Sequence, residues 1–398
     1  MSRGALLSET RPEGLDELLD DAGADGWLLY DFRDQNPIAH ELLGLGKTTR
    51  RAFALVPRKG EPHLLHHAIE GSAWREWRWA RSTYRDWREL ASGLRDLLEG
   101  MGTVAMEHSP GSAVPTVDRV PAGVLELVRA TGVRVVSSGD LVSACHSRWS
   151  EQGLSLHRRA AGIVRSTAMA AFERARDAAA AGEPIGERTL MGWIADRLRR
   201  EGVTEQVGCI VAAGESAADP HYEPAGEGES LAAGSLVLID LWGAFPDGGI
   251  PADQTWMAVL GDEAPERWHE VWRAACAARD GALDLLCARS EAKAEVLGWE
   301  VDEAAREILR ARGFGEWFVH RLGHSIDSEL HGSGPNLDHL ESRDERRLIP
   351  GVGFSVEPGI YIPGEIGVRT EVNVYWGPKG PEVTTPGPQG ELLFFPVG

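Results

Sequence analysis

Two apolar segments of the chain each carry one aspartate, Asp240 and Asp253, at a position where the side-chain pattern predicts burial. Both segments are rich in strand-forming side chains and flank a turn at Asp247-Gly248, which predicts a β-hairpin. Such a hairpin brings the two aspartates close together in space, and a buried carboxylate is costly unless it is paired or bound to a metal ion. The alternative is that one aspartate faces solvent or caps the turn.

Three histidines cluster further along the chain. His320, His324 and His331 lie within 12 positions, although the whole sequence has only 13 histidines. Neutral imidazole is a common metal ligand and a proton carrier near pH 7, whereas Arg321 occupies the place of the glutamate that the zinc motif H-E-x-x-H requires. The cluster therefore excludes a site of that zinc type and leaves a structural and a catalytic role equally open.

Two glutamates near the C-terminus extend this set of side chains. Glu357 ends an apolar run at a Pro-Gly pair, and Glu371 lies in a second run of alternating character. The alternation predicts one strand on which Glu371 and Arg369 share a face, so we expect Arg369 to pair with a ligand carboxylate, with Asp240 as the candidate. The simpler interpretation is an exposed Arg369–Glu371 pair, worth less than about 1 kcal/mol.

Together these side chains have the charge and chemistry of one metal site. Two aspartates, one histidine and two glutamates carry four negative charges, which two divalent cations would neutralise. A carboxylate-rich set with a single imidazole suits Mn²⁺, Co²⁺, Zn²⁺ or Fe²⁺, and two such ions about 3.5–4 Å apart can activate a water molecule at neutral pH. The candidate ligands are Asp240, Asp253, His324, Glu357 and Glu371.

In this order along the chain, the motifs resemble those of the pita-bread metallopeptidases, which include methionine aminopeptidase, Xaa-Pro aminopeptidase and prolidase, with creatinase as a metal-free relative. The resemblance covers residues 150–396 and includes a segment around His221 that is similar to the family's substrate-contacting histidine. The spacing of the three clustered histidines is similar to that of the prolidase branch. A preceding domain over residues 1–150 is typical of the creatinase, prolidase and Xaa-Pro aminopeptidase branch.

The resemblance implies an α+β protein with two domains. A smaller N-terminal α/β domain of the creatinase type would span residues 1–150, and the catalytic pita-bread domain would span residues 151–398. The resemblance also implies a homodimer and two divalent metal ions, for which Mn²⁺ is expected and Co²⁺ or Zn²⁺ are the alternatives.

The implied activity is hydrolysis of Xaa-Pro peptide bonds, by an aminopeptidase or a dipeptidase, through a hydroxide that bridges the two ions. Glu357 would be both a ligand and the carrier of the proton to the leaving nitrogen. His221 and His331 would contact the substrate and stabilise the oxyanion. His320 and Arg369 are further substrate-binding candidates, and the alternative for His320 is to orient another group from outside the pocket.

Three features depart from the prolidase branch and leave the substrate open. Trp256 occupies a position where the branch usually has arginine, and Gly332 follows His331 in place of an acidic residue. The spacing between Asp240 and Asp253 is also two residues longer than usual. Two alternatives therefore stand beside the peptidase: a metal-free C–N hydrolase like creatinase, and a pita-bread binding module without catalysis. The intact ligand positions favour the peptidase over both.

The bulk properties exclude several other classes of protein. A chain of 398 residues is too long for one ordinary hydrophobic core, so two domains are expected. Its formal net charge of −20 repels phosphate backbones and anionic lipids, so we expect neither a nucleic acid nor a membrane as partner. The 4 cysteines are widely spaced, which favours neither a disulfide framework nor a zinc ribbon. The first 13 residues lack the apolar core of a signal peptide, and we expect a cytoplasmic enzyme that acts on peptides.

The elements that must position these residues are predicted from side-chain periodicity and breakers. In the first domain we expect helices over residues 14–24 and 90–100, strands over 26–30, 53–57, 103–106 and 133–137, and a mixture of helix and loop over 74–87. In the second domain we expect helices over 152–181, 189–200, 264–288 and 302–312. Because short strands and Gly/Pro turns separate these helices, the pattern favours α+β over a doubly wound parallel sheet.

Overall fold

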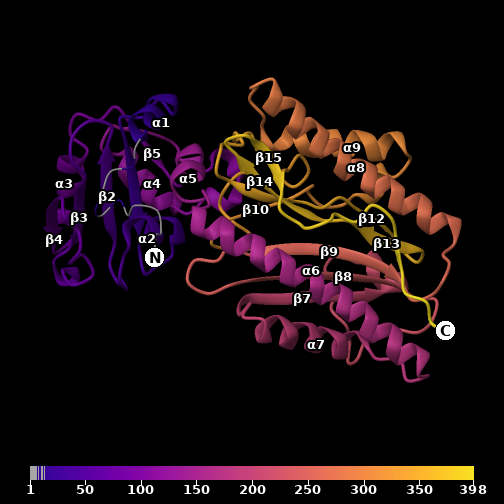
Figure 1. The fold of residues 1–398 in the computed structure, drawn as a ribbon. Helices are drawn as coiled ribbons and strands as arrows, with labels where there is room; N and C mark the ends of the chain where they lie inside the picture. The colour runs from indigo at the N-terminus through magenta and orange to yellow at the C-terminus, as the bar shows by residue number, and fades with distance from the viewer. Residues whose placement is uncertain (1–6, 8, 10–11, 13) are drawn as a thin grey trace. The chain divides into compact units, whose positions relative to one another are not determined.

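The computed structural model describes residues 7, 9, 12 and 14–398 of the chain. The chain separates into two compact units, one that ends at Arg148 and one that spans Trp149–Gly398, and each is described by itself (Figure 1). The sequence prediction placed this boundary after residue 150. The stretch 1–13, on which the prediction of no signal peptide depends, lies largely outside the described residues. Along the described part of the chain, no helix is both long and apolar enough to cross a membrane.

The N-terminal unit is built on one mixed six-stranded sheet. Its strands are β1 (Gly26–Asp31), β2 (Ala52–Pro57), β3 (His63–His67), β4 (Ala80–Tyr84), β5 (Thr103–Met106) and β6 (Arg134–Ser137). The order across the sheet is β4-β3-β2-β1-β5-β6, with β1 antiparallel to β2 and parallel to β5. Since side chains alternate between the two faces of a strand, the sheet has one apolar core around Trp27 and another around Phe53.

Helices cover both faces of this sheet. They are α1 (Leu15–Asp21), α2 (Pro37–Leu43), α3 (Trp87–Leu97), α4 (Ala122–Arg129) and α5 (Gly139–Cys145). Residues of α1, α2 and α5 belong to the core around Trp27, and residues of α3 and α4 belong to the core around Phe53. The prediction of mixed helix and loop over 74–87 was wrong: turns lead into β4, whose residues 80–83 are all exposed. Because β4 is an edge strand in which only Tyr84 is buried, it lacks the alternation that marks a strand.

The second unit holds three further sheets. Their strands are β7 (Glu205–Ala213), β8 (Leu236–Ala244), β9 (Ala252–Val259), β10 (Ser325–Ile326), β11 (Gly353–Val356), β12 (Gly359–Ile362), β13 (Ile366–Arg369), β14 (Val372–Gly377), β15 (Gly380–Val383) and β16 (Leu393–Phe394). The orders are β16-β9-β8-β7, β10-β11-β14-β15 and β12-β13. The predicted single strand around Glu371 is therefore wrong, because β13 ends at Arg369 and β14 begins in a different sheet.

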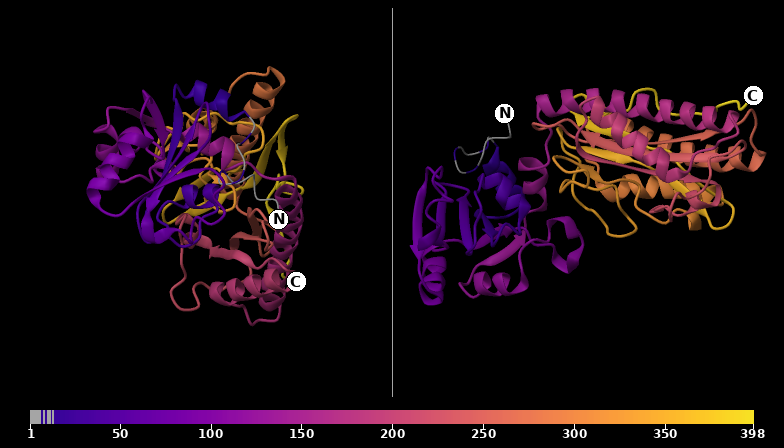
Figure 2. Two further views of the ribbon diagram at one scale, coloured as in Figure 1. Left: turned by 90° about the vertical axis from the view of Figure 1, so that its left-hand side faces the viewer. Right: turned by 90° about the horizontal axis from the view of Figure 1, so that it is seen from below.

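Long helices pack against these sheets. They are α6 (Glu151–Ala180), α7 (Glu187–Arg200), α8 (Glu266–Glu291) and α9 (Gly298–Ala311), close to the predicted ranges. Helix α6 packs on β8 and β9, and α7 packs on β7, as the long magenta helix in Figure 2 illustrates. Helix α8 packs on α9, β13 and β15. Two apolar cores lie between the helices and the sheets, which is the mixed arrangement that the α+β prediction describes.

The predicted hairpin between the two aspartates is confirmed. Strands β8 and β9 pair antiparallel, with Asp240 opposite Thr255 and Trp242 opposite Asp253. Positive φ angles of 62° at Asp247 and 90° at Gly248 form the turn, a conformation that Asp and Gly tolerate best. Since residues two apart on a strand share a face, both aspartates lie on the same face of the hairpin as diagonal neighbours.

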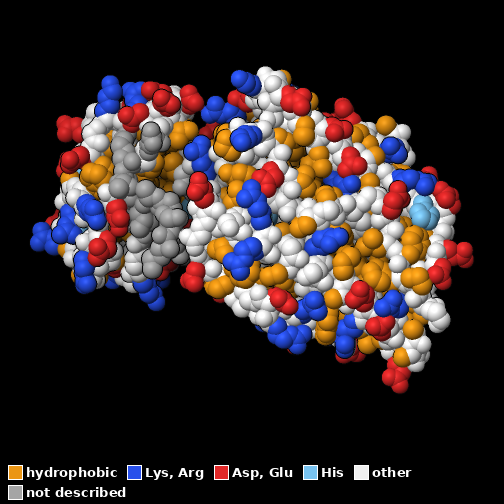
Figure 3. Space-filling model, viewed as in Figure 1, with side chains coloured by type: hydrophobic (Ala, Val, Ile, Leu, Met, Phe, Trp, Pro, Cys, Tyr) orange, Lys and Arg blue, Asp and Glu red, His pale blue; other side chains and the backbone are white. Residues whose placement is uncertain are grey.

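The acidic excess of the chain is not concentrated on the face drawn in Figure 3. There, acidic, basic and hydrophobic side chains are interspersed over both units. Many of the ion pairs join exposed partners, such as Arg158 with Glu382, and pairs of this kind contribute little to stability. This face therefore carries charges of both signs side by side, and the informative carboxylates are the buried ones.

Candidate metal centre

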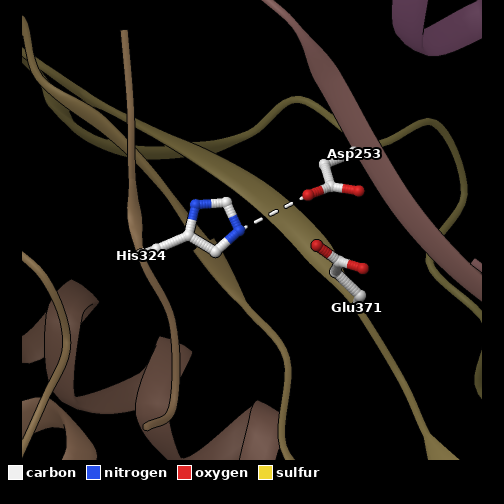
Figure 4. A group of neighbouring side chains, drawn as sticks. All are labelled: Asp253, His324 and Glu371. Carbon is white, nitrogen blue, oxygen red and sulfur yellow. Dashed lines mark ion pairs between the residues drawn. The ribbon is translucent and has the colours of Figure 1, made fainter. Parts of the chain in front are cut away.

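Three of the predicted ligands converge in the interior of the second unit. Asp253 comes from β9, His324 from the residue before β10, and Glu371 from the junction between β13 and β14. All three are buried, and one potential ligand atom of each lies within 4.8 Å of the other two. Their side chains point toward one another in Figure 4. Asp253 and Glu371, which are 118 positions apart in the sequence, thus belong to one cluster.

The other two predicted ligands border this cluster. Glu357, which follows β11, places its Oε1 atom 3.4 Å from His324 Nε2, the same distance that separates His324 Nε2 from Asp253 Oδ2. Asp240 lies beside Asp253 on the hairpin, and the guanidinium of Arg369 contacts Asp240 Oδ2 at 2.5 Å. The expected pairing of Arg369 with Asp240 is therefore confirmed.

The imidazole of His324 is oriented as a metal ligand requires. Its Nδ1 atom lies 3.1 Å from the backbone carbonyl oxygen of Ser325, so the neutral ring carries its hydrogen on Nδ1 and donates it to that carbonyl. The Nε2 lone pair then faces the carboxylates of Asp253 and Glu357. A backbone carbonyl that fixes the tautomer in this way is the usual support of a metal-binding histidine.

Unpartnered oxygens show that these residues fit divalent cations. Asp240 Oδ1, Asp253 Oδ1 and Glu371 Oε1 are buried and have no hydrogen-bond partner within the described chain. A buried carboxylate oxygen without a donor loses its hydration without compensation. Oxygen donors together with one imidazole are the ligands that divalent ions such as Mn²⁺, Co²⁺ or Zn²⁺ accept, so a cation would satisfy the atoms that the protein leaves unpaired.

The acid–base properties of the cluster reflect the same uncompensated charge. Burial raises the pKa of Asp240 to about 8, even though Arg369 opposes this change. Burial and the neighbouring charge of Asp253 raise the pKa of Glu371 well above its usual range. Glu357 differs: burial by itself would raise its pKa, but the nearby imidazoles of His324 and His320 bring it below its ordinary value. The carboxylates therefore do not form a uniform acidic patch.

A second layer of side chains holds the ligands, and it is only partly visible in the sequence. Thr255 donates from Oγ1 to Glu371 Oε2 at 2.8 Å and accepts from Arg369 Nε at 3.0 Å. Ser355 donates to Glu357 Oε1 at 2.9 Å. Thr255 lies two residues from Asp253 on β9, and Ser355 on β11 lies two residues before Glu357, so the period of two could have identified them. Such partners orient ligands and tune the metal.

His320 and Tyr361 extend this layer beyond the ligands. His320 Nδ1 donates to the carbonyl of Arg321 at 2.7 Å, and burial lowers the pKa of His320 to about 4. The neutral ring therefore accepts from the Tyr361 hydroxyl at 2.9 Å, while that hydroxyl accepts from Arg369 Nη1 at 3.2 Å. His320 is thus linked to Arg369 through the Tyr361 hydroxyl, which supports the alternative that the sequence left open beside substrate binding.

The two remaining histidines are exposed and differ in their surroundings. The His331 ring lies edge-on to that of His324, with the centroids 4.4 Å apart, so it borders the cluster on its accessible side. His221 lies in the loop that follows the short helix η4 (Gly214–Ala218), and its backbone N–H donates to Asp219 Oδ1 at 3.0 Å. Among the contacts given for the described residues, none joins the His221 ring to the five ligand candidates.

Trp256 does not face the cluster. It alternates with Asp253 and Thr255 on β9, and it is buried in the core on the side of α6. Its Nε1 atom donates to Gln254 Oε1 at 3.0 Å, and Gln254 in turn donates to the carbonyl of Ala161 in α6 at 3.0 Å. The departure from arginine at this position thus affects helix packing behind the hairpin.

The comparisons with known proteins agree with this geometry. The sequence model described as metallopeptidase family M24 matches residues 155–377, a segment that contains all five ligand candidates. An Xaa-Pro dipeptidase of Lactobacillus helveticus is 34% identical over 189 residues, which are 47% of this chain and 47% of that protein. The alignment thus spans about half the length of this curated relative.

Two further relatives are similar over most of the chain. A protein of Mycobacterium bovis named probable dipeptidase PepE is 28% identical over 358 residues, covering 88% of this chain and 87% of its own length. The crystal structure of dipeptidase PepE from Mycobacterium ulcerans matches with a TM-score of 0.72 at 24% identity, covering 98% of this chain and 97% of that one. The likeness to this solved structure confirms the predicted fold.

Proposed function

Because the chain belongs to metallopeptidase family M24, we propose that it is a divalent-metal-dependent peptidase that hydrolyses Xaa-Pro bonds, either as an aminopeptidase or as a dipeptidase. The observation that carries this proposal is the set of buried carboxylate oxygens without a hydrogen-bond donor around His324. The bond class is supported by the relative named Xaa-Pro dipeptidase. The family implies divalent metal ions, and the proposal specifies two of them, with Mn²⁺ before Co²⁺ or Zn²⁺.

Five residues form the proposed metal centre. The residues that would hold the ions are Asp240, Asp253, His324, Glu357 and Glu371. When bound, the ions supply Lewis-acid activation of water and of the scissile carbonyl. Arg369 holds Asp240 in one orientation, and Thr255 does the same for Glu371, so the ligands are pre-arranged before substrate arrives.

Glu357 is the proposed carrier of the proton to the leaving nitrogen. Its side chain is 15% exposed, whereas that of Asp253 is 7% exposed, so Glu357 can exchange a proton with the pocket. Ser355 donates to Glu357 Oε1 and fixes the orientation of the carboxylate. His331, exposed beside His324, is the proposed contact to the substrate carbonyl. A contact of His221 with the substrate is a further part of the proposal.

The remaining features of the proposal concern the enzyme as a whole. We propose a homodimer in the cytoplasm that takes peptides as substrates and binds neither nucleic acid nor membrane. The net charge of −20 supports the last point, because such a surface repels polyanions.

The experiment that tests the proposal compares metal-stripped protein with protein reloaded separately with Mn²⁺, Co²⁺ or Zn²⁺. Substrates are Xaa-Pro dipeptides, Xaa-Pro-Yaa tripeptides and the same peptides with alanine in place of proline. We expect cleavage before proline only after reloading, with about two ions bound per chain by elemental analysis. Dipeptides and tripeptides distinguish a dipeptidase from an aminopeptidase.

Two results would contradict the proposal. Turnover that persists after thorough chelation would favour a metal-free C–N hydrolase. Fewer than about one bound ion per chain after reloading, together with no cleavage of any peptide, would favour a binding module without catalysis.

A further inference from the structure

A buried carboxylate outside the metal centre, that of Glu187, accepts three hydrogen bonds. Glu187 is the first residue of α7 and is fully buried. Its Oε1 atom accepts from the backbone N–H of Ala213 at 2.8 Å. Its Oε2 atom accepts from the Tyr222 hydroxyl at 2.7 Å and from the backbone N–H of Glu229 at 2.9 Å. Three donors are ample compensation for burying one carboxylate.

These three donors enclose the loop that carries His221. Ala213 is the last residue of β7, immediately before the loop, and Glu229 lies at its far end. Tyr222, the residue next to His221, packs its ring against the main core of the unit. Glu187 therefore holds the beginning, the middle and the end of one loop with a single side chain, while His221 remains exposed between these points.

The neighbouring residues of α7 hold the same loop. The Arg188 guanidinium donates to the carbonyl of Gly226 at 2.6 Å, and Thr189 donates to Glu227 Oε2 at 2.6 Å. Gly228 has a φ of +70°, and a Cβ atom there would lie 2.2 Å from Glu187 Oε2. The loop backbone therefore approaches the carboxylate as closely as only glycine permits.

The opposite side of the loop packs on a strand that supports the metal centre. A Cβ atom at Gly367 in β13 would lie 1.7 Å from the carbonyl oxygen of Ala217 in η4, so the two backbones are in direct contact. Strand β13 ends at Arg369, the residue that pairs with Asp240. The loop is thus enclosed between the first turn of α7 and the strand that holds Arg369.

We infer that Glu187 is a positioning residue that places His221 for catalysis by holding both ends of the loop over residues 213–229. The inference depends on the proposed function, because it assigns His221 to the substrate. Glu187 touches neither substrate nor metal in this role. It acts through the loop backbone and Tyr222, and Arg188 and Thr189 reinforce it.

The first test measures the loop without reference to activity. In the Glu187→Gln variant an amide NH₂ replaces one carboxylate oxygen, so at least one backbone N–H faces a donor and loses its acceptor. We expect hydrogen exchange at Ala213 or Glu229 to accelerate about tenfold or more in the metal-free protein. Tyr222→Phe removes one hydrogen bond without this conflict and should give a smaller acceleration.

The matched control is Asp25→Asn in the N-terminal unit. Asp25 Oδ2 also accepts two backbone N–H groups, those of Gly102 and Thr103, at 2.8 and 2.9 Å. Because both N–H groups bind the same oxygen, the amide carbonyl of asparagine can keep both hydrogen bonds, so this variant should leave exchange at its own two donors, exchange of the His221 loop and kcat/KM nearly unchanged. It controls for the general effect of replacing a carboxylate that binds backbone N–H groups.

The second test is a double-mutant cycle between Glu187→Gln and His221→Ala on the reloaded enzyme. We expect each single variant to lower kcat/KM about 10- to 100-fold, and the double variant to be no worse than the poorer single variant, because Glu187 acts through His221. Multiplicative losses would show that the two residues act independently and would overturn the inference. Unchanged exchange of the loop in Glu187→Gln would overturn it as well.

The outcome for the proposed function can be distinguished from the outcome for the loop. If the wild-type enzyme cleaves no Xaa-Pro peptide, the proposed function is wrong. The role of Glu187 in that function is then wrong as well, whatever the hydrogen exchange of the loop shows. If the wild type is active but Glu187→Gln retains full kcat/KM, the inference alone is wrong.

Discussion

Each of the two units buries carboxylates, but the carboxylates of the metal centre in the second unit differ from Glu107 in the N-terminal unit. In the N-terminal unit, Glu107 is fully buried and accepts from Trp27 Nε1 at 2.6 Å, Asn36 Nδ2 at 2.9 Å and Ser138 Oγ at 3.1 Å. Both of its oxygens therefore have donors. In the second unit, one oxygen of each of Asp240, Asp253 and Glu371 is buried and finds no hydrogen-bond partner among the described residues.

The difference distinguishes a structural carboxylate from a ligand. A fold that buries a carboxylate for its own stability supplies donors from its own side chains, as around Glu107. The unsatisfied oxygens near His324 instead lose stability in the isolated chain, a cost that a bound cation would offset. Unsatisfied oxygens around a histidine thus mark the functional unit more directly than burial does.

The largest effect is expected from Asp253→Ala, which tests whether the carboxylates with unsatisfied oxygens are metal ligands. Loss of a proposed ligand should lower kcat/KM by more than the ~100-fold that loss of an outer-shell partner costs. The metal-free variant should be at least as stable as the metal-free wild type, because the substitution removes a buried carboxylate with an unsatisfied oxygen from among other carboxylates. Steady-state kinetics and thermal unfolding in chelator check both points.

The matched control for Asp253→Ala is Glu107→Gln. It should leave kcat/KM unchanged and destabilise the N-terminal unit, because the amide NH₂ meets donors. If Asp253→Ala destabilised the metal-free protein and Glu107→Gln did not, the distinction between the two kinds of carboxylate would be lost.

An intermediate effect is expected from Arg369→Lys, which changes the support of a ligand. Arg369 donates to Asp240, Thr255 and Tyr361 in three directions, and a lysine ammonium on a flexible stem does not reproduce this planar arrangement. Metal affinity should fall about 10- to 100-fold, as measured by metal titration, and excess metal should restore part of the activity.

An exposed arginine provides the control for Arg369→Lys. Arg158 pairs with Glu382 on the surface, with Nη2 and Oε2 2.7 Å apart, and Arg158→Lys should leave metal affinity unchanged. Equal losses in the two variants would mean that the buried position of Arg369 does not matter.

The last prediction concerns the pH dependence of stability in the N-terminal unit, where no metal ligand is involved. Burial raises the pKa of Glu107 from 4.5 to about 7, so the folded state retains a proton that the unfolded state has already lost. The contribution of Glu107 is therefore fully present below its unfolded pKa and is lost as the pH rises through about 7. The free energy of unfolding should fall by up to about 3 kcal/mol over this range, since one pKa unit is about 1.4 kcal/mol.

In Glu107→Gln this part of the pH dependence should be absent. The free energy of unfolding of the variant and of the wild type is compared by urea unfolding at pH 5 and pH 7. Hydrogen exchange of the backbone in β1 and β5 monitors the N-terminal unit in these experiments. An identical pH dependence in both proteins would show that Glu107 does not titrate in this range.

Much of the architecture could be predicted from the sequence because it depends on local patterns. The predicted helices over 152–181 and 189–200 correspond to α6 and α7, because long segments without breakers have few alternatives. The β8–β9 hairpin followed from Asp247 and Gly248, whose backbone the turn requires. Edge strand β4 could not be predicted, because its exposed residues carry no alternation.

The candidate site was predicted only in part. The five ligand candidates stood out as carboxylates and a histidine in apolar surroundings, but Glu371 was assigned to the wrong element, because local alternation does not reveal where a chain passes from one sheet to another. Thr255 and Ser355 escaped notice, although each lies two residues from a ligand. Glu187 carries no local sign of its role, because its three acceptor contacts reach across 26, 35 and 42 positions.

The sequence by itself determined the family and the candidate ligands, since order, spacing and residue type are local properties that survive without coordinates. Only the tertiary structure decided which oxygens lack partners, that His320 contacts Tyr361, and that Trp256 packs away from the cluster. It also brought Glu187 to the His221 loop. The physical reason is that hydrogen-bond satisfaction and burial depend on atoms contributed by distant segments, and no local pattern of the sequence specifies which segments meet.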